Sequence, residues 1–343
     1  MKTALITGIT GQDGAYLSRL LLDKGYRVVG AYRRGATLNL WRLRELGIAD
    51  GEVELVPFEL LEYENIRRVI QKVQPDEIYN LAAQTFVAAS FEQPIYTTET
   101  NALGPMRILE AIREINPKIR FYQASTSEMF GKVSETPQSE TTPFHPRSPY
   151  GNAKLYAHWA TVNYREAYGL FACCGILFNH ESQLRGTEFV TRKITQGLAQ
   201  IRLGQKDQIA LGNLDAKRDW GFAGDYVEGM WLMLQTDRPS DYILATGQTT
   251  SVRSFASLAA ETLGFKLEWQ GEGTEEQGCT NKPIIVVDPN LYRPTEVDLL
   301  VGDATRAREL LGWEPKTSLH KLIAMMVEAD LKRCKDGQLQ EAA

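Results

Sequence analysis

A glycine-rich turn near the start of the chain places the strongest limit on its fold. Residues 2–7 form a short apolar run typical of a buried parallel strand, and residues 15–24 carry leucines at helical spacing. Glycines between a strand and a helix let backbone amides approach a pyrophosphate that faces the helix N-terminus. The turn therefore predicts a dinucleotide site, with an ordinary strand-to-helix turn as the alternative. The site would comprise Gly8, Ile9, Thr10, Gly11, Gln12, Asp13 and Gly14.

Two arginines after the second predicted strand indicate which dinucleotide binds. Residues 27–32 form that strand, and Arg33 and Arg34 follow it. An NAD site usually has a carboxylate there for the ribose hydroxyls, whereas guanidinium groups match the 2′-phosphate of NADP. We therefore expect NADP; a solvated basic pair is the alternative.

The first half of the chain continues to alternate between strand and helix patterns. Strands are predicted at 53–57, 77–81, 119–125 and 171–178, and helices at 63–73, 99–115 and 148–168. This order favours an α/β fold, a Rossmann-type doubly wound parallel sheet with a smaller, mixed α/β C-terminal lobe. The expected units are a cofactor-binding domain with the catalytic residues (1–178), a substrate-binding lobe with some segments returning to the sheet (179–335) and a polar tail (336–343).

A tyrosine and a lysine on the helix predicted at 148–168 form a candidate catalytic pair. Tyr150 and Lys154 are four residues apart and share one helix face. We expect the ammonium of Lys154 to lower the pKa of the phenol from its usual value of about 10. Such a phenol can accept a proton from an alcohol that loses hydride, and Thr126 can hydrogen-bond the developing carbonyl.

Charge and cysteine content exclude several classes of protein. The net charge is −5 over 343 residues, with both signs mixed, which disfavours nucleic acid or a membrane surface as a partner. The first residues run directly into a strand and no stretch is typical of a membrane span, so we expect a cytoplasmic protein. Cys173, Cys174, Cys279 and Cys334 lack metal-ligand spacing, so we expect reduced thiols and no metal site.

Longer motifs point to a family. They include Asn179-His180-Glu181-Ser182 and Ala216-Lys217-Arg218-Asp219-Trp220, together with residues 8–14, 121–128, 146–151, 189–193, 212–215 and 292–298. In these motifs the chain resembles the GDP-mannose 4,6-dehydratases, a group within the extended short-chain dehydrogenases/reductases. The resemblance runs from residue 3 to about residue 331.

The resemblance implies a role for each matching residue. Thr126, Glu128 and Tyr150 would be catalytic and contact substrate, with Lys154 supporting Tyr150 and binding the nicotinamide ribose. Further NADP contacts would come from residues 8–14 and from Arg33, Arg34, Gly35, Ala36, Glu59, Leu60, Leu81, Ala82, Ala83, Gln84, Thr85, Tyr96, His180 and Arg185. For His180, a structural hydrogen bond is an equal alternative. The GDP-sugar would contact Asn179, Lys193, Arg218, Arg293 and Glu296.

Glu128 indicates a dehydration rather than a simple oxidation. Once C4 of a hexose is oxidised, the C5 proton becomes acidic and a carboxylate can remove it. Loss of the C6 hydroxyl and return of hydride to C6 then give a 4-keto-6-deoxy sugar, with the cofactor regenerated. A lone glutamate is by default a surface or capping residue, but Glu128 lies between the segments that carry Thr126 and Tyr150.

Two departures from the family pattern bear on ligand choice. Glu59-Leu60 stands where relatives usually have an aspartate before the hydrophobic residue, and Gln183 stands where they usually have proline. Because the loop with Gln183 borders the sugar, GDP-manno-heptose is an alternative substrate to GDP-mannose. An epimerase or reductase and a non-catalytic dinucleotide sensor are the remaining alternatives.

The resemblance also implies a homo-oligomer. The helices at 99–115 and 148–168 would pair across a two-fold axis, and Leu155, Tyr156, His158, Trp159, Val162 and Tyr164 form an apolar set wider than one stripe. Residues 35–42 resemble a loop that joins dimers into tetramers beside the cofactor. We therefore expect a dimer through these helices and a homotetramer through the loop.

Overall fold

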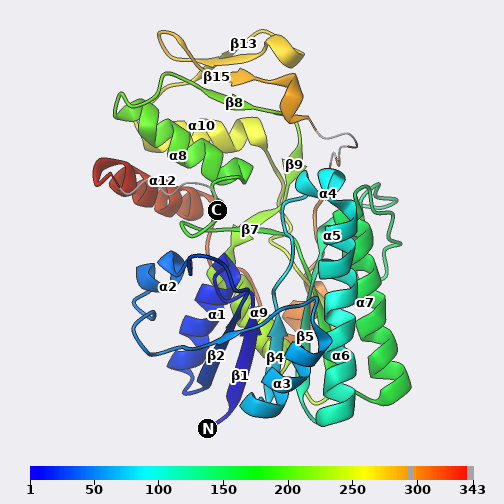
Figure 1. Cartoon of the computed structure of the whole chain (residues 1–343). Coiled ribbons are helices and arrows are strands. Elements are labelled where there is room, and N and C mark those ends of the chain that lie inside the picture. Colours follow the sequence, from blue (N-terminus) through cyan, green and yellow to red (C-terminus); the bar gives the residue numbers. More distant parts are fainter. Residues whose placement is uncertain (293–294, 296, 298, 338–343) are drawn as a thin grey trace.

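The computed structural model describes residues 1–292, 295, 297 and 299–337. Seven strands form a parallel sheet in the order β3, β2, β1, β4, β5, β6, β11 (Figure 1). Leu5 of β1 is in register with Val29 of β2 and Ile78 of β4. The strands are β1 Thr3–Thr7, β2 Arg27–Tyr32, β3 Glu54–Pro57, β4 Glu77–Asn80, β5 Arg120–Thr126, β6 Ala172–Leu177 and β11 Asp241–Leu244.

Helices cover both faces of this sheet, because successive residues of each strand point to opposite faces. Ala4 and Ile6 pack in a core with α1 (Gln12–Asp23) and α9 (Ala223–Met233). Leu5 packs in a second core on the other face. The helices of that face are α3 (Tyr63–Val73), α6 (Gly104–Ile115) and α7 (Pro149–Tyr168).

A smaller lobe has its own sheet, in the order β13, β14, β15, β8, and lies above the large sheet in Figure 1. Its core contains Leu198, Phe255, Ile285 and Met326. The strands are β8 Ile209–Leu211, β13 Glu268–Gln270, β14 Gln277–Cys279 and β15 Pro283–Val287. The helices are α8 Val190–Arg202, α10 Val252–Thr262 and α12 Leu319–Lys335.

Two short strand pairs lie between the large sheet and the smaller lobe (Figure 1). They are β7 (Asn179–Glu181) with β10 (Trp220–Phe222), and β9 (Lys217–Arg218) with β12 (Thr250–Ser251). The remaining short helices are α2 Trp41–Glu45, α4 Ala89–Glu92, α5 Pro94–Thr98 and α11 Thr305–Leu311, with a π-helix at Glu99–Leu103 and 3-10 turns at Ser127–Met129, Gly273–Glu275 and Pro289–Leu291. Among the described residues, no helix has both the length and the apolar character that a membrane crossing requires.

The predicted doubly wound α/β fold is confirmed, and most element boundaries agree within two residues. The helix predicted at 99–115 differs, because a π-helical turn at Glu99–Leu103 precedes α6. Pro105 lies in the first turn of α6, and a proline lacks the N–H needed for a helical hydrogen bond to the preceding turn. The long helix of the prediction is therefore two joined segments.

Candidate active site

The predicted glycine turn lies at the topological switch point of the large sheet. The neighbours β1 and β4 lead in opposite directions along the sheet order, so the loops that follow them leave a crevice between them. Gly8 has a φ of +73°, and a Cβ on it would lie 2.9 Å from the backbone nitrogen of Ala82. A Cβ on Gly14 would lie 2.5 Å from the carbonyl oxygen of Gly8. Larger residues at these positions would displace the loop.

A cavity of about 380 Å³ opens at this crevice. It brings together several predicted cofactor residues: Gly8, Thr10, Gly11, Gln12, Asp13, Gly14, Leu81, Ala83, Thr85 and Arg185. It is also lined by Asn39, Trp41 and Arg42, which belong to the loop predicted to join dimers beside the cofactor, and by Gly186, Thr187, Glu188 and Phe189, which were not predicted to contact the cofactor. The predicted Ile9 packs into the core below the turn instead.

Arg42 connects two segments that line the cavity. Its Nη1 donates to Thr10 O at 2.9 Å and its Nε donates to Leu184 O at 2.7 Å. Burial lowers its pKa to about 10. Arg42 thus joins the glycine turn to the loop after β7, a contact between distant segments that no local motif reveals.

Most of the other predicted NADP residues lie in the segments after β2, β3 and β4, and Tyr96 lies on α5. Arg33 and Arg34 are exposed, as are Gly35 and Ala36, and Arg33 donates a hydrogen bond to the hydroxyl of Tyr96. The carboxylate of Glu59 accepts from the backbone N–H of Leu61 at 3.3 Å. Leu60 is buried, and Ala82 N donates to the Thr7 hydroxyl at 3.1 Å. The backbone N–H of Gln84 donates to Asn101 Oδ1, and its carbonyl oxygen accepts from Asn101 Nδ2, both at 2.8 Å.

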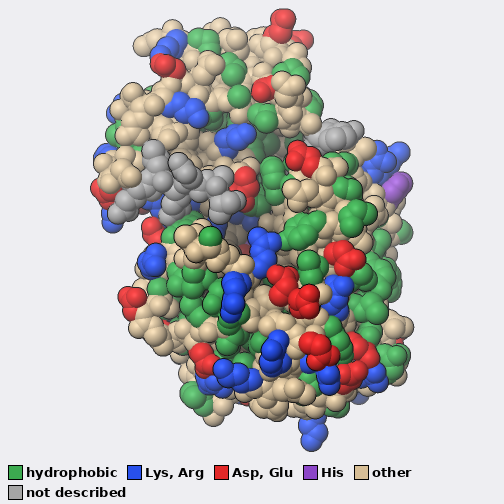
Figure 2. Space-filling view, viewed as in Figure 1, with side chains coloured by type: hydrophobic (Ala, Val, Ile, Leu, Met, Phe, Trp, Pro, Cys, Tyr) green, Lys and Arg blue, Asp and Glu red, His purple; other side chains and the backbone are tan. Residues whose placement is uncertain are grey.

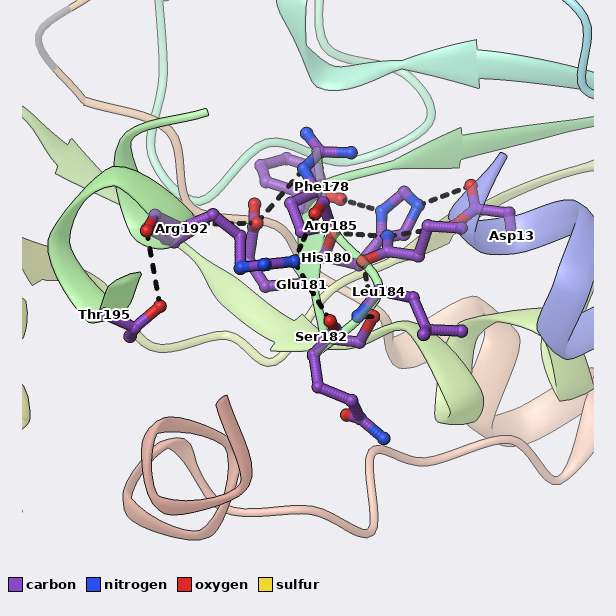
Figure 3. A network of polar contacts seen from close by, with 12 residues as sticks. Asp13, Phe178, His180, Glu181, Ser182, Leu184, Arg185, Arg192 and Thr195 are labelled. Carbon is purple, nitrogen blue, oxygen red and sulfur yellow. Dashed lines mark hydrogen bonds and ion pairs between the residues drawn. The ribbon is translucent and has the colours of Figure 1, made fainter. Parts of the chain in front are cut away.

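His180 and Asp13 form an ion pair beside the glycine turn (Figure 3). His180 Nε2 lies 2.8 Å from Asp13 Oδ2, and His180 Nδ1 lies 2.8 Å from the carbonyl oxygen of Phe178. Burial opposes both charges, but the attraction between them raises the pKa of His180 and lowers that of Asp13. Both ring nitrogens are therefore engaged in protein contacts, so the geometry favours the structural interpretation of His180.

The segment after β7 is held by an ion pair and by hydrogen bonds from Arg192, in the network that Figure 3 shows. Arg185 Nε lies 3.1 Å from the Glu181 carboxylate, and the Arg185 guanidinium stacks on the ring of Phe189. Arg192 of α8 donates from Nη1 to the carbonyl oxygens of Gln183 and Arg185, at 3.0 and 2.6 Å. These contacts fix the backbone of the loop from which Arg185 reaches the cavity wall.

The four predicted catalytic residues come together between β5 and α7. Thr126 ends β5, and its hydroxyl oxygen accepts from the backbone N–H of Glu128 at 3.2 Å. Thr126 is also near enough to Tyr150 to lower the pKa of the phenol. A Cβ on Gly151 would lie 2.9 Å from Glu128 O, so the start of α7 packs directly on the backbone of Glu128. All four side chains are buried, and Lys154 Nζ donates to Ala124 O at 2.9 Å.

The prediction that the pKa of Tyr150 is lowered is wrong. Burial raises the pKa of Tyr150 to about 12, although the hydrogen bond from Thr126 opposes the rise. Burial also lowers the pKa of Lys154 to about 8. The predicted lowering rests on the attraction between ammonium and phenolate, whereas the cost of burying either charge has the opposite effect on each pKa and is larger here.

The predicted sugar-nucleotide residues that the structure describes are Asn179 on β7, Lys193 on α8 and Arg218 on β9. Asn179 starts β7 in register with Trp220, two residues beyond the buried Arg218. The Oδ1 atom of Asn179 is buried and has no hydrogen-bond partner among the described residues. Lys193 of α8 is partly buried, which lowers its pKa. Arg293 and Glu296 lie outside the described residues.

Comparison with known proteins gives the family of this chain. The sequence profile described as "GDP-mannose 4,6 dehydratase" matches residues 5–326. The GDP-mannose 4,6-dehydratase of Sinorhizobium fredii is 55% identical over 339 residues, which cover 96% of this chain and 97% of that protein. This chain belongs to the GDP-mannose 4,6-dehydratase family. The family predicted from the motifs is therefore confirmed.

Solved structures at lower identity share the fold of this GDP-mannose 4,6-dehydratase family member. UDP-glucose 4-epimerase from Thermotoga maritima with UDP-glucose has a TM-score of 0.82 at 23% identity, covering 97% of this chain and 99% of that one. RMD from Pseudomonas aeruginosa complexed with NADPH has a TM-score of 0.75 at 21% identity, covering 97% and 100%. At these identities the likeness supports the fold alone.

Proposed function

We propose that this protein converts GDP-mannose to GDP-4-keto-6-deoxy-mannose and water, with NADP recycled in place. One observation carries the proposal: Glu128 is buried two residues after Thr126, and its backbone packs against the turn of α7 that presents Tyr150. Oxidation alone would need Thr126, Tyr150 and Lys154, whereas dehydration also needs a base for C5. The family of the chain supports the same reaction.

Tyr150 and Glu128 would carry out the proton transfers of the reaction, and Thr126 would assist Tyr150. Tyr150 accepts the proton of the C4 hydroxyl, while Thr126 hydrogen-bonds the oxygen that becomes the ketone. Glu128 takes the C5 proton and gives a proton to the C6 hydroxyl, which leaves as water. Solvent supplies the proton that C5 regains. When bound in the crevice, NADP would supply the hydride acceptor for C4 and the hydride donor for C6, so that no net oxidation would occur.

The residues of the crevice fit NADP. Backbone at Gly8 and Gly14 leaves no room for a Cβ, and the N-terminus of α1 points at the same place, which suits a pyrophosphate. Arg33 and Arg34 would hold the 2′-phosphate, because guanidinium groups pair with phosphate oxygens through two hydrogen bonds. Lys154 would bind the nicotinamide ribose.

The experiment that tests the function is product analysis. Purified protein is incubated separately with GDP-mannose and with GDP-manno-heptose, and products are identified by mass spectrometry. Loss of one water from GDP-mannose is expected. The Oε1 atom of Gln183 is buried without a hydrogen-bond partner among the described residues, and this observation keeps the heptose, with its extra hydroxyl, as a second candidate. Turnover of the heptose alone would replace mannose as the substrate, and no water loss from either sugar would refute the dehydratase.

We also propose that different parts of the chain bind the cofactor and the substrate. Residues 1–178 would bind NADP and carry the catalytic groups, and residues 179–335 would bind the GDP-sugar, with β11 and α9 returning to the large sheet. The sugar nucleotide would contact Asn179, Lys193 and Arg218. Arg293 and Glu296 remain proposed contacts outside the described residues. The proposed location of the enzyme is the cytoplasm.

Apolar side chains on α6 and α7 support a homodimer. Trp159 is 55% exposed and Tyr156 46%, while His158 beside them is buried. Figure 2 shows hydrophobic side chains gathered over the side formed by α5, α6 and α7. A second copy packed on this side would bury the exposed rings. A homotetramer would form through residues 35–42, whose Asn39, Trp41 and Arg42 line the proposed cofactor cavity.

A further inference from the structure

Three side chains on one face of α7 hold three consecutive residues at the end of β5. The three side chains are spaced four residues apart, so they lie above one another along the helix. Thr126 lies near enough to Tyr150 to lower the pKa of its phenol. Lys154 Nζ donates to Ala124 O at 2.9 Å, and His158 Nδ1 lies 3.2 Å from Ser125 Oγ. The first two of these contacts involve proposed catalytic residues, whereas His158 and Ser125 have no part in the reaction described above.

His158 is buried in a setting that suits a fixed hydrogen bond. Its ring packs edge-on against Phe144 at 5.4 Å, and its carbonyl oxygen accepts from the thiol of Cys174. Burial lowers its pKa, and the nearest charges, Asp241 and Arg165, are paired with each other at 2.6 Å. A neutral imidazole keeps one donor and one acceptor nitrogen, so it can bond the Ser125 hydroxyl in either tautomer.

We propose that His158 is a positioning residue for the dehydratase reaction. Its hydrogen bond to Ser125 fixes the backbone that carries Ala124 and Thr126 on either side. That backbone sets where the Thr126 hydroxyl meets Tyr150 and where the ammonium of Lys154 is held. The inference rests on the proposed function, since it concerns the placement of the groups that act on C4.

The position of these groups matters because catalysis depends on near-contact geometry. A displacement of about 1 Å at a reacting group can lower a rate by about a hundredfold. Loss of the His158 contact would remove a buried hydrogen bond of the Ser125 hydroxyl and would loosen β5 at its last residues. The effect should fall on kcat, because the contacts of His158 among the described residues are with Ser125, Cys174, Phe144 and Trp159, not with the glycine turn or with Asn179, Lys193 or Arg218.

The test compares variants at both ends of the hydrogen bond. His158→Leu keeps an apolar side chain of similar size without a polar atom, and His158→Asn keeps a polar atom near the position of Nδ1. Ser125→Ala removes the partner, and His320→Leu, at an exposed histidine on α12, is the matched control. For each variant, kcat and KM for GDP-mannose, the dissociation constant of NADP and the unfolding midpoint are measured.

We expect His158→Leu and Ser125→Ala each to lower kcat by about ten- to a hundredfold, with KM and NADP affinity within twofold of the parent. His158→Asn should recover most of the rate, and the double variant should be no slower than either single variant. Parent-like kcat in His158→Leu, or losses in the double variant that multiply, would overturn the inference. If His158→Leu does not fold, the kcat of Ser125→Ala tests the inference, and a parent-like kcat in that variant would overturn it. A parent without activity on GDP-mannose would instead refute the proposed function.

Discussion

The buried ion pair between α8 and α12 allows a stability prediction with a definite magnitude. Arg192 and Asp330 are each 1% exposed, with Nη2 and Oδ1 2.8 Å apart. The same carboxylate accepts from Arg192 Nε at 3.0 Å and from the hydroxyl of Thr195 at 2.7 Å. Asp330→Asn keeps the shape of this side chain but removes its charge. The Arg192 guanidinium then stays buried beside a neutral amide in place of a carboxylate.

Breaking one side of a buried pair costs about 3–5 kcal/mol, because the remaining charge cannot be hydrated. Asn retains an acceptor for Arg192, so we expect a loss near the lower value, about 3 kcal/mol in the free energy of unfolding. Urea denaturation followed by tryptophan fluorescence measures it. Glu54→Gln, which removes the charge from the half-exposed pair with Arg27, serves as the control and should leave the midpoint unchanged. A loss below about 1 kcal/mol in Asp330→Asn would show that another group or water compensates the Arg192 charge.

Three further outcomes follow from the same geometry. Replacing Arg33 and Arg34 with alanine should weaken NADP binding by about 1.5–3 kcal/mol per lost charged hydrogen bond and leave NAD binding unchanged; equal affinity of the parent for both cofactors, measured by calorimetry, would contradict this. The Asp13–His180 pair stabilises the fold fully between the unfolded pKa values of about 3.9 and about 6.5. Its contribution is lost as the pH rises through the raised pKa of His180, or falls through the lowered pKa of Asp13. Asp13→Asn should therefore have a lower free energy of unfolding than the parent at pH 6, and the difference between the two should become smaller as the pH rises. A difference that does not change with pH would contradict a stabilising role of the pair. Trp159→Glu should convert the proposed dimer to monomers in sedimentation velocity, whereas a parent that is already monomeric at micromolar concentration would rule out this interface.

Local patterns were sufficient to predict the fold and to locate the candidate site. Apolar runs and helical spacing identify strands and helices because the side chains alternate with fixed periods, and Gly8 marks its turn because the φ there is positive. The pair Tyr150 and Lys154 could be placed on one face from spacing alone.

What the sequence could not show depends on contacts between distant segments. Arg42 contacts Leu184, and His158 contacts Ser125, yet neither pair belongs to a motif that predicts the contact. The raised pKa of Tyr150 was missed for the same reason, since it arises from burial by the surrounding fold. The π-helical turn before α6 was also missed, because its residues have ordinary helical spacing.

The role of Glu128 is the central claim, and solvent isotope incorporation tests it most directly. Parent enzyme and Glu128→Gln are incubated with GDP-mannose and NADP in deuterium oxide, and the sugar is analysed by NMR and mass spectrometry. The parent should form the 4-keto-6-deoxy product with deuterium at C5, because the C5 proton passes to Glu128 and C5 is reprotonated from solvent. Glu128→Gln should bind NADP with parent affinity, release no water and incorporate no deuterium at C5. Near-parent turnover with deuterium at C5 in Glu128→Gln would contradict the account.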